Sequence, residues 1–169
     1  MRKPIAVGFL SHLKKIIIPV FVLFLTLELP SVAAALSEQT DSSPFDTVTT
    51  FFGDWNMGEI PAASKLFVPN PSMTDVFPRF HWQGKNAFRQ FFSDLDISNI
   101  KEGFSDYFFD VGTPQSIEVE GTLAQVIVPV VIDLKHDGQP ITVPGLVNFV
   151  LRQKRSSWKI TSFTWTSTE

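Results

Sequence analysis

Cysteine is absent from this chain of 169 residues, and tyrosine occurs only once, at Tyr107. Without cysteine the protein can form neither a disulfide bond nor a lipid-modified cysteine, and thiol catalysis is excluded. The sequence also lacks a Gly-x-Ser-x-Gly nucleophile motif and a glycine-rich phosphate loop. We therefore expect neither a serine or cysteine nucleophile nor a bound cofactor.

No apolar run is long enough to suggest a membrane span, which needs about 20 apolar residues. The run over residues 16–27 is shorter and leads to Val32-Ala33-Ala34-Ala35. Four basic residues precede it: Arg2, Lys3, Lys14 and Lys15. This order predicts a secretory signal peptide over residues 1–35, cleaved after Ala35, with a retained membrane anchor as the alternative. We expect a secreted or periplasmic bacterial protein.

Positive charge is scarce in the rest of the chain. Removal of residues 1–35 takes away four of the 14 Lys and Arg residues and one of the 17 Asp and Glu residues, which leaves 10 basic residues against 16 acidic ones. Nucleic-acid phosphates require a basic surface, so we expect no nucleic-acid partner. The remaining length suits one domain over residues 44–169, preceded by a flexible tail over residues 36–43.

Phenylalanine is abundant, with 17 residues in the chain, and many of them recur at helical spacing. A helix is predicted to begin at Ser43-Pro44, a capping residue followed by proline, and to end near residue 55. Further helices are predicted over residues 61–67 and 85–95. Pro69-Asn70-Pro71 is expected to end the first of these two.

Alternation of apolar and polar residues predicts strands at 72–77, 107–111, 115–120, 124–134, 141–151 and 158–166. His81–Gly84 is predicted to be a turn, and Asp137-Gly138 a hairpin turn. Pro129 cannot donate to a strand ladder and is expected at a bulge or a sheet edge. These elements predict an α+β fold, a cone-shaped, curved antiparallel sheet with about three N-terminal helices on its concave face around a pocket.

A family resemblance is carried by segments that span residues 44–166. They are Phe51–Gly58, Ala63–Phe67, a strand with Asp75, Gly84 before a Phe-rich helix, and Trp158–Ile160. In this order they resemble the nuclear transport factor 2-like superfamily, which includes ketosteroid isomerase and the SnoaL-like polyketide cyclases. The resemblance implies the cone-shaped fold, which serves enzymes and non-enzymes alike.

The resemblance to ketosteroid isomerase can be followed for three functional positions. The general-base aspartate matches Asp75, the oxyanion-binding tyrosine matches Phe51, and the assisting acid falls near Val147. The resemblance therefore implies a base without its usual oxyanion donors, and such donors contribute strongly to the rate. Other residues could donate instead: His81, Trp82, Tyr107 or Asn148.

Asp75 and His81 are the candidate catalytic residues. Burial against apolar neighbours would raise the pKa of Asp75, as a general base requires. The alternative for Asp75 is an ion pair with Arg79. His81 lies close enough in sequence to line the same cavity, and the alternative is a turn residue on its rim. Asp75, His81 and a further acidic residue are the conceivable metal ligands. Because the histidines are not closely spaced in the sequence, we expect no metal site there.

Eight further residues are the candidate ligand-binding residues: Phe51, Trp55, Phe77, Trp82, Phe88, Tyr107, Val147 and Phe149. The first hypothesis is a module that binds a small, largely apolar molecule without catalysis. The alternative is an isomerase, cyclase or dehydratase in which Asp75 is the general base and His81 or Tyr107 supports the charge. In a third hypothesis, the functional surface is the outer face of the sheet, which carries Asn148 and Arg152. A homodimer could form through this face.

Overall fold

The computed structural model describes residues 42–77 and 79–168. The predicted signal peptide and residues 36–41 of the predicted tail lie outside the described residues. Within the described part of the chain, no helix is both long and apolar enough to cross a membrane.

The described residues contain three helices: α1 (Pro44–Asn56), α2 (Ile60–Ser64) and α3 (Ala87–Glu102). Ser43 begins α1 as predicted, because its Oγ accepts the Asp46 N–H at 3.1 Å and the Asp46 carboxylate accepts the Ser43 N–H at 2.8 Å. α2 ends earlier than the predicted residue 67. α3 continues well past the predicted residue 95 and ends at Glu102, with Gly103 as its C-cap.

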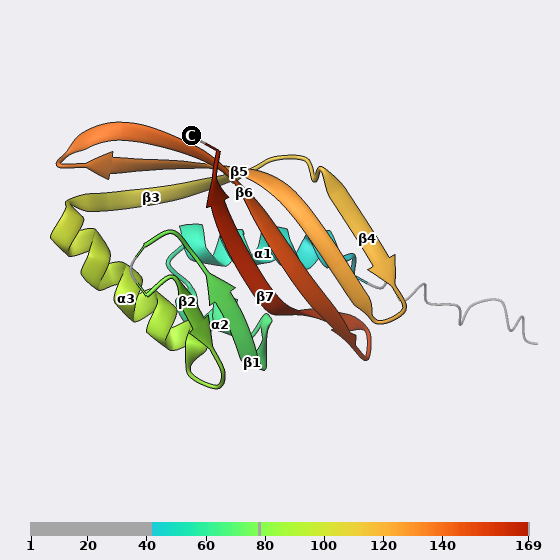
Figure 1. Ribbon diagram of the computed structural model, residues 1–169. Helices are drawn as coiled ribbons and strands as arrows, with labels where there is room; N and C mark the ends of the chain where they lie inside the picture. The colour runs from blue at the N-terminus through green and yellow to red at the C-terminus, as the bar shows by residue number, and fades with distance from the viewer. Residues whose placement is uncertain (1–41, 78, 169) are drawn as a thin grey trace, which may run out of the picture. The chain divides into compact units, whose positions relative to one another are not determined.

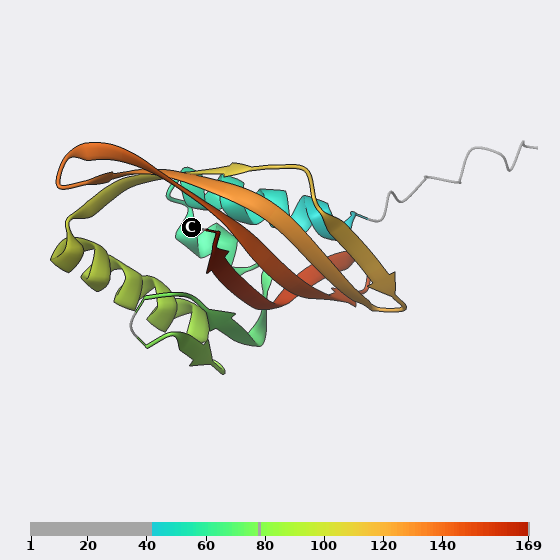
Figure 2. The same ribbon diagram turned by 45° about the horizontal axis from the view of Figure 1, so that its top comes forward.

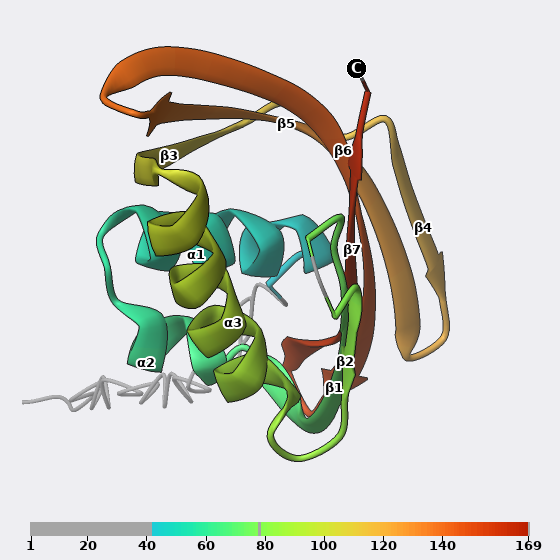
Figure 3. The same cartoon turned by 60° about the vertical axis from the view of Figure 1, so that its left-hand side comes forward.

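Seven strands form one sheet: β1 (Phe67–Thr74), β2 (His81–Gln83), β3 (Phe104–Val111), β4 (Ser116–Glu120), β5 (Leu123–His136), β6 (Gln139–Lys154) and β7 (Ser157–Ser167). Their order is β2-β1-β7-β6-β5-β3, with β4 also paired to β5. β1 and β7 run parallel, and the other pairs are antiparallel. The long strands β5 and β6 curve over α1 and α3 (Figures 1 and 3). The predicted α+β fold is confirmed.

The prediction that Pro69-Asn70-Pro71 ends the second helix is wrong. Pro69-Asn70-Pro71 lies inside β1, and Phe67 is the first residue of that strand. The register between β1 and β7 shifts between Phe67 and Ser72, and β1 pairs with β2 from Ser72 onward. The two prolines therefore occupy a stretch outside the regular ladder, where their missing N–H groups are tolerated.

Other element boundaries differ from the prediction by a few residues. Ser72–Thr74 pair with His81–Gln83, so the residues predicted to form a turn make the short strand β2. The strand predicted to reach residue 77 ends at Thr74, and β3 begins at Phe104 rather than at Tyr107. At β2 a local turn signal is overridden by pairing with β1, and at β3 pairing with β5 extends the strand back to Phe104.

Pro129 lies where β5 changes its partner on one side. The pairs with β3 end at Val130, the pairs with β4 begin at Ile127, and the Pro129 carbonyl accepts the Gly112 N–H at 2.9 Å. On the other side, the register with β6 continues through Pro129. Figure 2 shows β3 and β4 along different halves of β5. Of the two expected positions, a bulge or a sheet edge, Pro129 therefore occupies a local edge of β5, in the gap between two partner strands.

Aromatic rings join the helices to the concave face of the sheet. Phe51 and Phe52 of α1 pack against Phe149 of β6, with ring centroids 5.9 and 5.8 Å apart. Phe91 of α3 meets Phe163 of β7 at 5.8 Å. Such edge-to-face pairs contribute about 0.5–1.5 kcal/mol each beyond the burial of their area. This aromatic core fixes α1 and α3 on the sheet.

Candidate functional site

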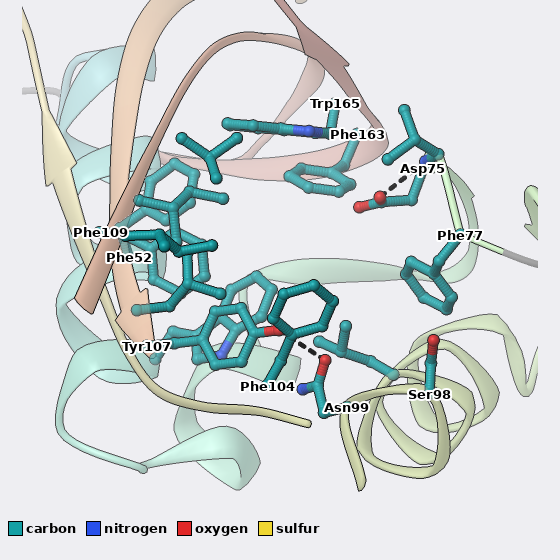
Figure 4. Close-up of a pocket in the computed structure, with 17 residues that line it drawn as sticks. Phe52, Asp75, Phe77, Ser98, Asn99, Phe104, Tyr107, Phe109, Phe163 and Trp165 are labelled. Carbon is teal, nitrogen blue, oxygen red and sulfur yellow. Dashed lines mark hydrogen bonds between the residues drawn. The ribbon is translucent and has the colours of Figure 1, made fainter. Parts of the chain in front are cut away.

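A cavity of about 210 Å³ lies beside the aromatic core, with walls from α1, α3, the end of β1 and the inner faces of β3, β5, β6 and β7. Most of its walls are apolar, and the rings include Phe52, Trp55, Phe77, Phe104, Phe109, Phe163 and Trp165 (Figure 4). The polar side chains other than tryptophan are Asp75, Ser98, Asn99 and Tyr107. A cavity of about 150 Å³ suffices for benzene, so this one has room for one or two rings.

Asp75 follows the last residue of β1 and points its carboxyl group into the cavity (Figure 4). Its Oδ1 accepts the Val76 N–H at 2.7 Å, and its own N–H donates to the Phe80 carbonyl at 3.1 Å. Burial raises the pKa of Asp75 from 3.8 to about 6, although hydrogen bonds from the Val76 and Phe77 backbone act to lower it. The carboxyl group therefore exchanges its proton near neutral pH.

Arg79 does not neutralise Asp75. Arg79 Nε lies 3.3 Å from Asp94 Oδ2 on α3, and the same oxygen accepts the Trp82 indole N–H at 2.8 Å. No ion pair found among residues 42–77 and 79–168 involves Asp75. The alternative in which Arg79 holds Asp75 is therefore replaced by a pair between Arg79 and Asp94.

Tyr107 on β3 and Asn99 on α3 form a polar pair in the cavity wall. The Tyr107 hydroxyl donates to Asn99 Oδ1 at 2.5 Å. Burial and, secondly, the negative charge of Asp75 raise the pKa of Tyr107 to about 12. The hydroxyl therefore keeps its proton at neutral pH, and the Asp75 charge acts on Tyr107 within the same cavity.

Asn56, the last residue of α1, holds β3 in place beside this cavity. Its Nδ2 donates to the Phe109 carbonyl at 2.9 Å, and its Oδ1 accepts the Phe109 N–H at 2.8 Å. The side chain thus imitates a strand partner for β3. This clamp positions Phe109, and with it Tyr107 on the same strand, as part of the cavity wall.

The structure brings four of the predicted site residues together: Asp75, Trp55, Phe77 and Tyr107 all line the cavity. His81 lies elsewhere, on β2, where its exposed ring has Nδ1 3.2 Å from Thr74 Oγ1. His81 does not line the cavity.

The other predicted ligand-binding residues lie in the core: Phe51, Trp82, Phe88, Val147 and Phe149 are not among the cavity-lining residues. Phe51, Val147 and Phe149 have no exposed surface. The Phe88 ring packs 5.0 Å from Phe67 and 4.6 Å from Phe92. On β6, Asn148 faces the outer side as predicted and its Oδ1 accepts a hydrogen bond from Gln125.

Sequence reasoning missed Ser98 and Asn99, because the apolar stripe of the third helix ends at Leu95. A signal was available in Gly103, which adopts a φ of 75° after the last residue of α3 and donates its N–H to the Asn99 carbonyl. Glycine in this conformation is typical of a helix end. It would have extended the predicted helix to both residues.

Metal binding finds no support in the described ranges, where no group of three or more histidine, aspartate or glutamate side chains is arranged to hold an ion.

No family model matches the sequence, and no curated protein is significantly similar to it. Solved structures do resemble it. An NTF2-like protein with a cystatin-like fold from Novosphingobium aromaticivorans is 15% identical, with 73% of this chain and 79% of that chain covered and a TM-score of 0.58. A ketosteroid isomerase-like protein from Erwinia carotovora atroseptica is 13% identical, with 73% and 92% covered and a TM-score of 0.56.

A CaMKII hub from S. rosetta is 18% identical, with 75% of this chain and 98% of that chain covered and a TM-score of 0.58. At such identities the likeness shows the fold alone. The chain has the nuclear transport factor 2-like fold that its sequence resembles. Because a hub and an isomerase-like protein share this fold, function must be argued from the cavity.

Proposed function

We propose that the domain binds a small, largely apolar molecule of one or two rings in the cavity, where the Asp75 carboxylate accepts a hydrogen bond from a ligand hydroxyl. The observation that carries this proposal is the carboxyl group of Asp75, which lies in an aromatic cavity and has no cationic partner among residues 42–77 and 79–168. Above pH 6 the group is ionised, and its hydrogen-bond donors in the described part of the chain are backbone N–H groups. A ligand hydroxyl would supply the hydrogen bond that a buried carboxylate favours.

The shape and lining of the cavity support an aromatic or alicyclic ligand. Its aromatic walls come from α1, β3, β7 and Phe77, which follows β1. Flat walls of this kind suit ring stacking and edge-to-face contacts. A mainly apolar pocket with a few polar groups is also the usual composition of a small-molecule site.

Equilibrium dialysis with 2-naphthol and naphthalene tests the proposal. At pH 8 we expect saturable binding of both probes, with 2-naphthol preferred. In Asp75→Asn this preference should fall about 5-fold, because a neutral acceptor replaces a charged one at a difference of about 1 kcal/mol. Asp110→Asn removes a charge at an exposed position and should change nothing. Absence of saturable binding, or a preference unchanged in Asp75→Asn, would refute the proposal.

Proton transfer is the second candidate function, favoured by the pKa of about 6 at Asp75. A carboxylate of this basicity in an apolar site suits abstraction of a proton next to a carbonyl group. The proton would pass from carbon to Asp75, leaving an enolate, and a solvent-exchanged proton would return. Exchange of the C2 protons of 1-tetralone in D₂O, followed by NMR, should then be faster with the wild type than with Asp75→Asn. Equal rates would refute catalysis and leave the binding function.

We also propose export of the protein, on the basis of the basic, apolar and small-residue order of residues 1–35. N-terminal sequencing of periplasmic or secreted material should find Leu36 first. Recovery of intact Met1 in the membrane fraction would favour the retained anchor instead.

A further inference from the structure

We propose that Asn99 is a second ligand-binding group of the cavity, whose side-chain N–H donates to a ligand carbonyl oxygen, and that Tyr107 positions it. This inference rests on the proposed function and narrows the ligand class. The ligand would be a small cyclic ketone that also carries a hydroxyl group. The hydroxyl would face Asp75 and the carbonyl would face Asn99.

The hydrogen bond between the Tyr107 and Asn99 side chains has a defined direction. Asn99 Oδ1 accepts from the Tyr107 hydroxyl at 2.5 Å, so the oxygen end of the amide is held by β3 (Figure 4). A planar amide with its oxygen fixed has its two N–H donors fixed as well. In the described part of the chain those donors have no partner, and Asn99 lines the cavity.

The backbone of Asn99 is fixed too. Asn99 lies in the last turn of α3, where its carbonyl accepts the Gly103 N–H. The chain then turns directly into β3, which carries Tyr107. Donor, acceptor and the turn between them thus form one short unit, as preorganised binding requires.

Tyr107 itself is the weaker candidate for the ligand donor. A phenol has a single proton, and that of Tyr107 is directed to Asn99. Ser98 also lines the cavity, but no described residue forms a hydrogen bond with its hydroxyl, so nothing fixes its direction. Among the polar residues of the cavity, Asn99 is the neutral donor whose orientation is set by the protein.

The polar groups of the cavity are therefore complementary. Ionised Asp75 can only accept a hydrogen bond, whereas the free arm of Asn99 can only donate one. Asp75 follows β1 and Asn99 belongs to α3, and both residues line the cavity (Figure 4). A ligand with one donor and one acceptor satisfies both, and a plain hydrocarbon leaves both unpaired.

The test compares 1-tetralone with tetralin, the same ring system without the carbonyl oxygen, by equilibrium dialysis at pH 8. One neutral hydrogen bond corresponds to about 3- to 10-fold tighter binding of the ketone to the wild type. Asn99→Asp keeps an acceptor for Tyr107 but removes the N–H donor, so the ratio should fall to about 1. Tyr107→Phe should reduce the ratio without abolishing it. Asn70→Asp makes the same change at an exposed site and should leave the ratio unchanged.

The wavenumber of the carbonyl stretch of bound 1-tetralone depends on a hydrogen bond to the carbonyl oxygen. It would not shift if Asn99 had only a structural role. In the wild type the band should shift to lower wavenumber, and in Asn99→Asp it should return to its position in an apolar solvent. The position of the band in the wild type is measured without any variant. This measurement can therefore refute the proposal even if Asn99→Asp fails to fold. An unshifted band in the wild type would overturn it.

The outcomes separate this inference from the proposed function. If Tyr107→Phe abolishes the ketone preference and Asn99→Asp keeps it, Tyr107 is the donor and the inference is wrong. If the wild type shows no ketone preference but binds 2-naphthol in a manner that depends on Asp75, only the proposed function survives. If neither probe binds, both fail.

Discussion

Replacement of Asp75 by asparagine should stabilise the domain at neutral pH. A pKa raised from 3.8 to about 6 corresponds to about 3 kcal/mol against the ionised folded state. Because the side chain is only half-buried, solvent screening reduces the expected gain to about 1–2 kcal/mol. The asparagine Oδ1 can still accept the Val76 N–H, so the substitution removes the charge and little else.

The sign of the pH dependence follows from proton binding. The folded pKa lies above the unfolded pKa, so between about pH 4 and pH 6 the folded wild type binds more protons than the unfolded chain. The wild type therefore has its full free energy of unfolding below pH 4. As the pH rises to 6, this free energy falls relative to that of Asp75→Asn. Above pH 6 the difference should stay constant.

Urea unfolding of both proteins at unit intervals from pH 4 to pH 8 measures this difference. Asp110→Asn, an exposed site, serves as the control. The expected gain corresponds to a rise in Tm of roughly 3–8 °C at neutral pH. A difference that is independent of pH, or a variant less stable than the wild type at pH 7, would refute a buried carboxyl group in the cavity.

Three further predictions concern the framework of the site. Phe51→Tyr should lower the free energy of unfolding by about 1–3 kcal/mol in urea and create no isomerase activity, because the residue is completely buried outside the cavity. Asn56→Ala should lower it by about 2–3 kcal/mol, since both hydrogen bonds to Phe109 are lost, whereas Asn56→Asp keeps the acceptor and should lose less. Gly103→Ala should lower Tm, because φ is 75° and a Cβ would collide with the Asp137 carboxylate; Asp137→Ala should restore part of the loss.

The parts of the fold that follow from local chemistry were predictable. Ser43 and Pro44 begin α1 because the cap is made within one turn, and alternation placed the long C-terminal strands. Pro69 and Pro71 misled the prediction, since their tolerance depends on a register shift between β1 and β7. Such a shift arises from pairing between distant segments and leaves no local signal.

The candidate site was predictable in part. Asp75 was found through the family resemblance, and the structure places it in a cavity. Alternation correctly assigned Val147 and Phe149 to the inner face of β6, yet both lie in the core rather than beside the cavity. The period of a strand identifies a face, but what covers each part of that face is decided by tertiary packing. Asn99 escaped notice because a polar residue near a helix end looks like solvent-exposed surface.

Intermolecular NOEs between bound 2-naphthol and methyl groups of the sheet show directly whether the ligand occupies the cavity. Ile132 and Val143 line the cavity, whereas Val131 alternates with Ile132 and faces the opposite side of β5. We expect contacts from the naphthol ring protons to Ile132 and Val143 and none to Val131. Contacts confined to Val131, or none to the cavity methyl groups at saturating ligand, would contradict it.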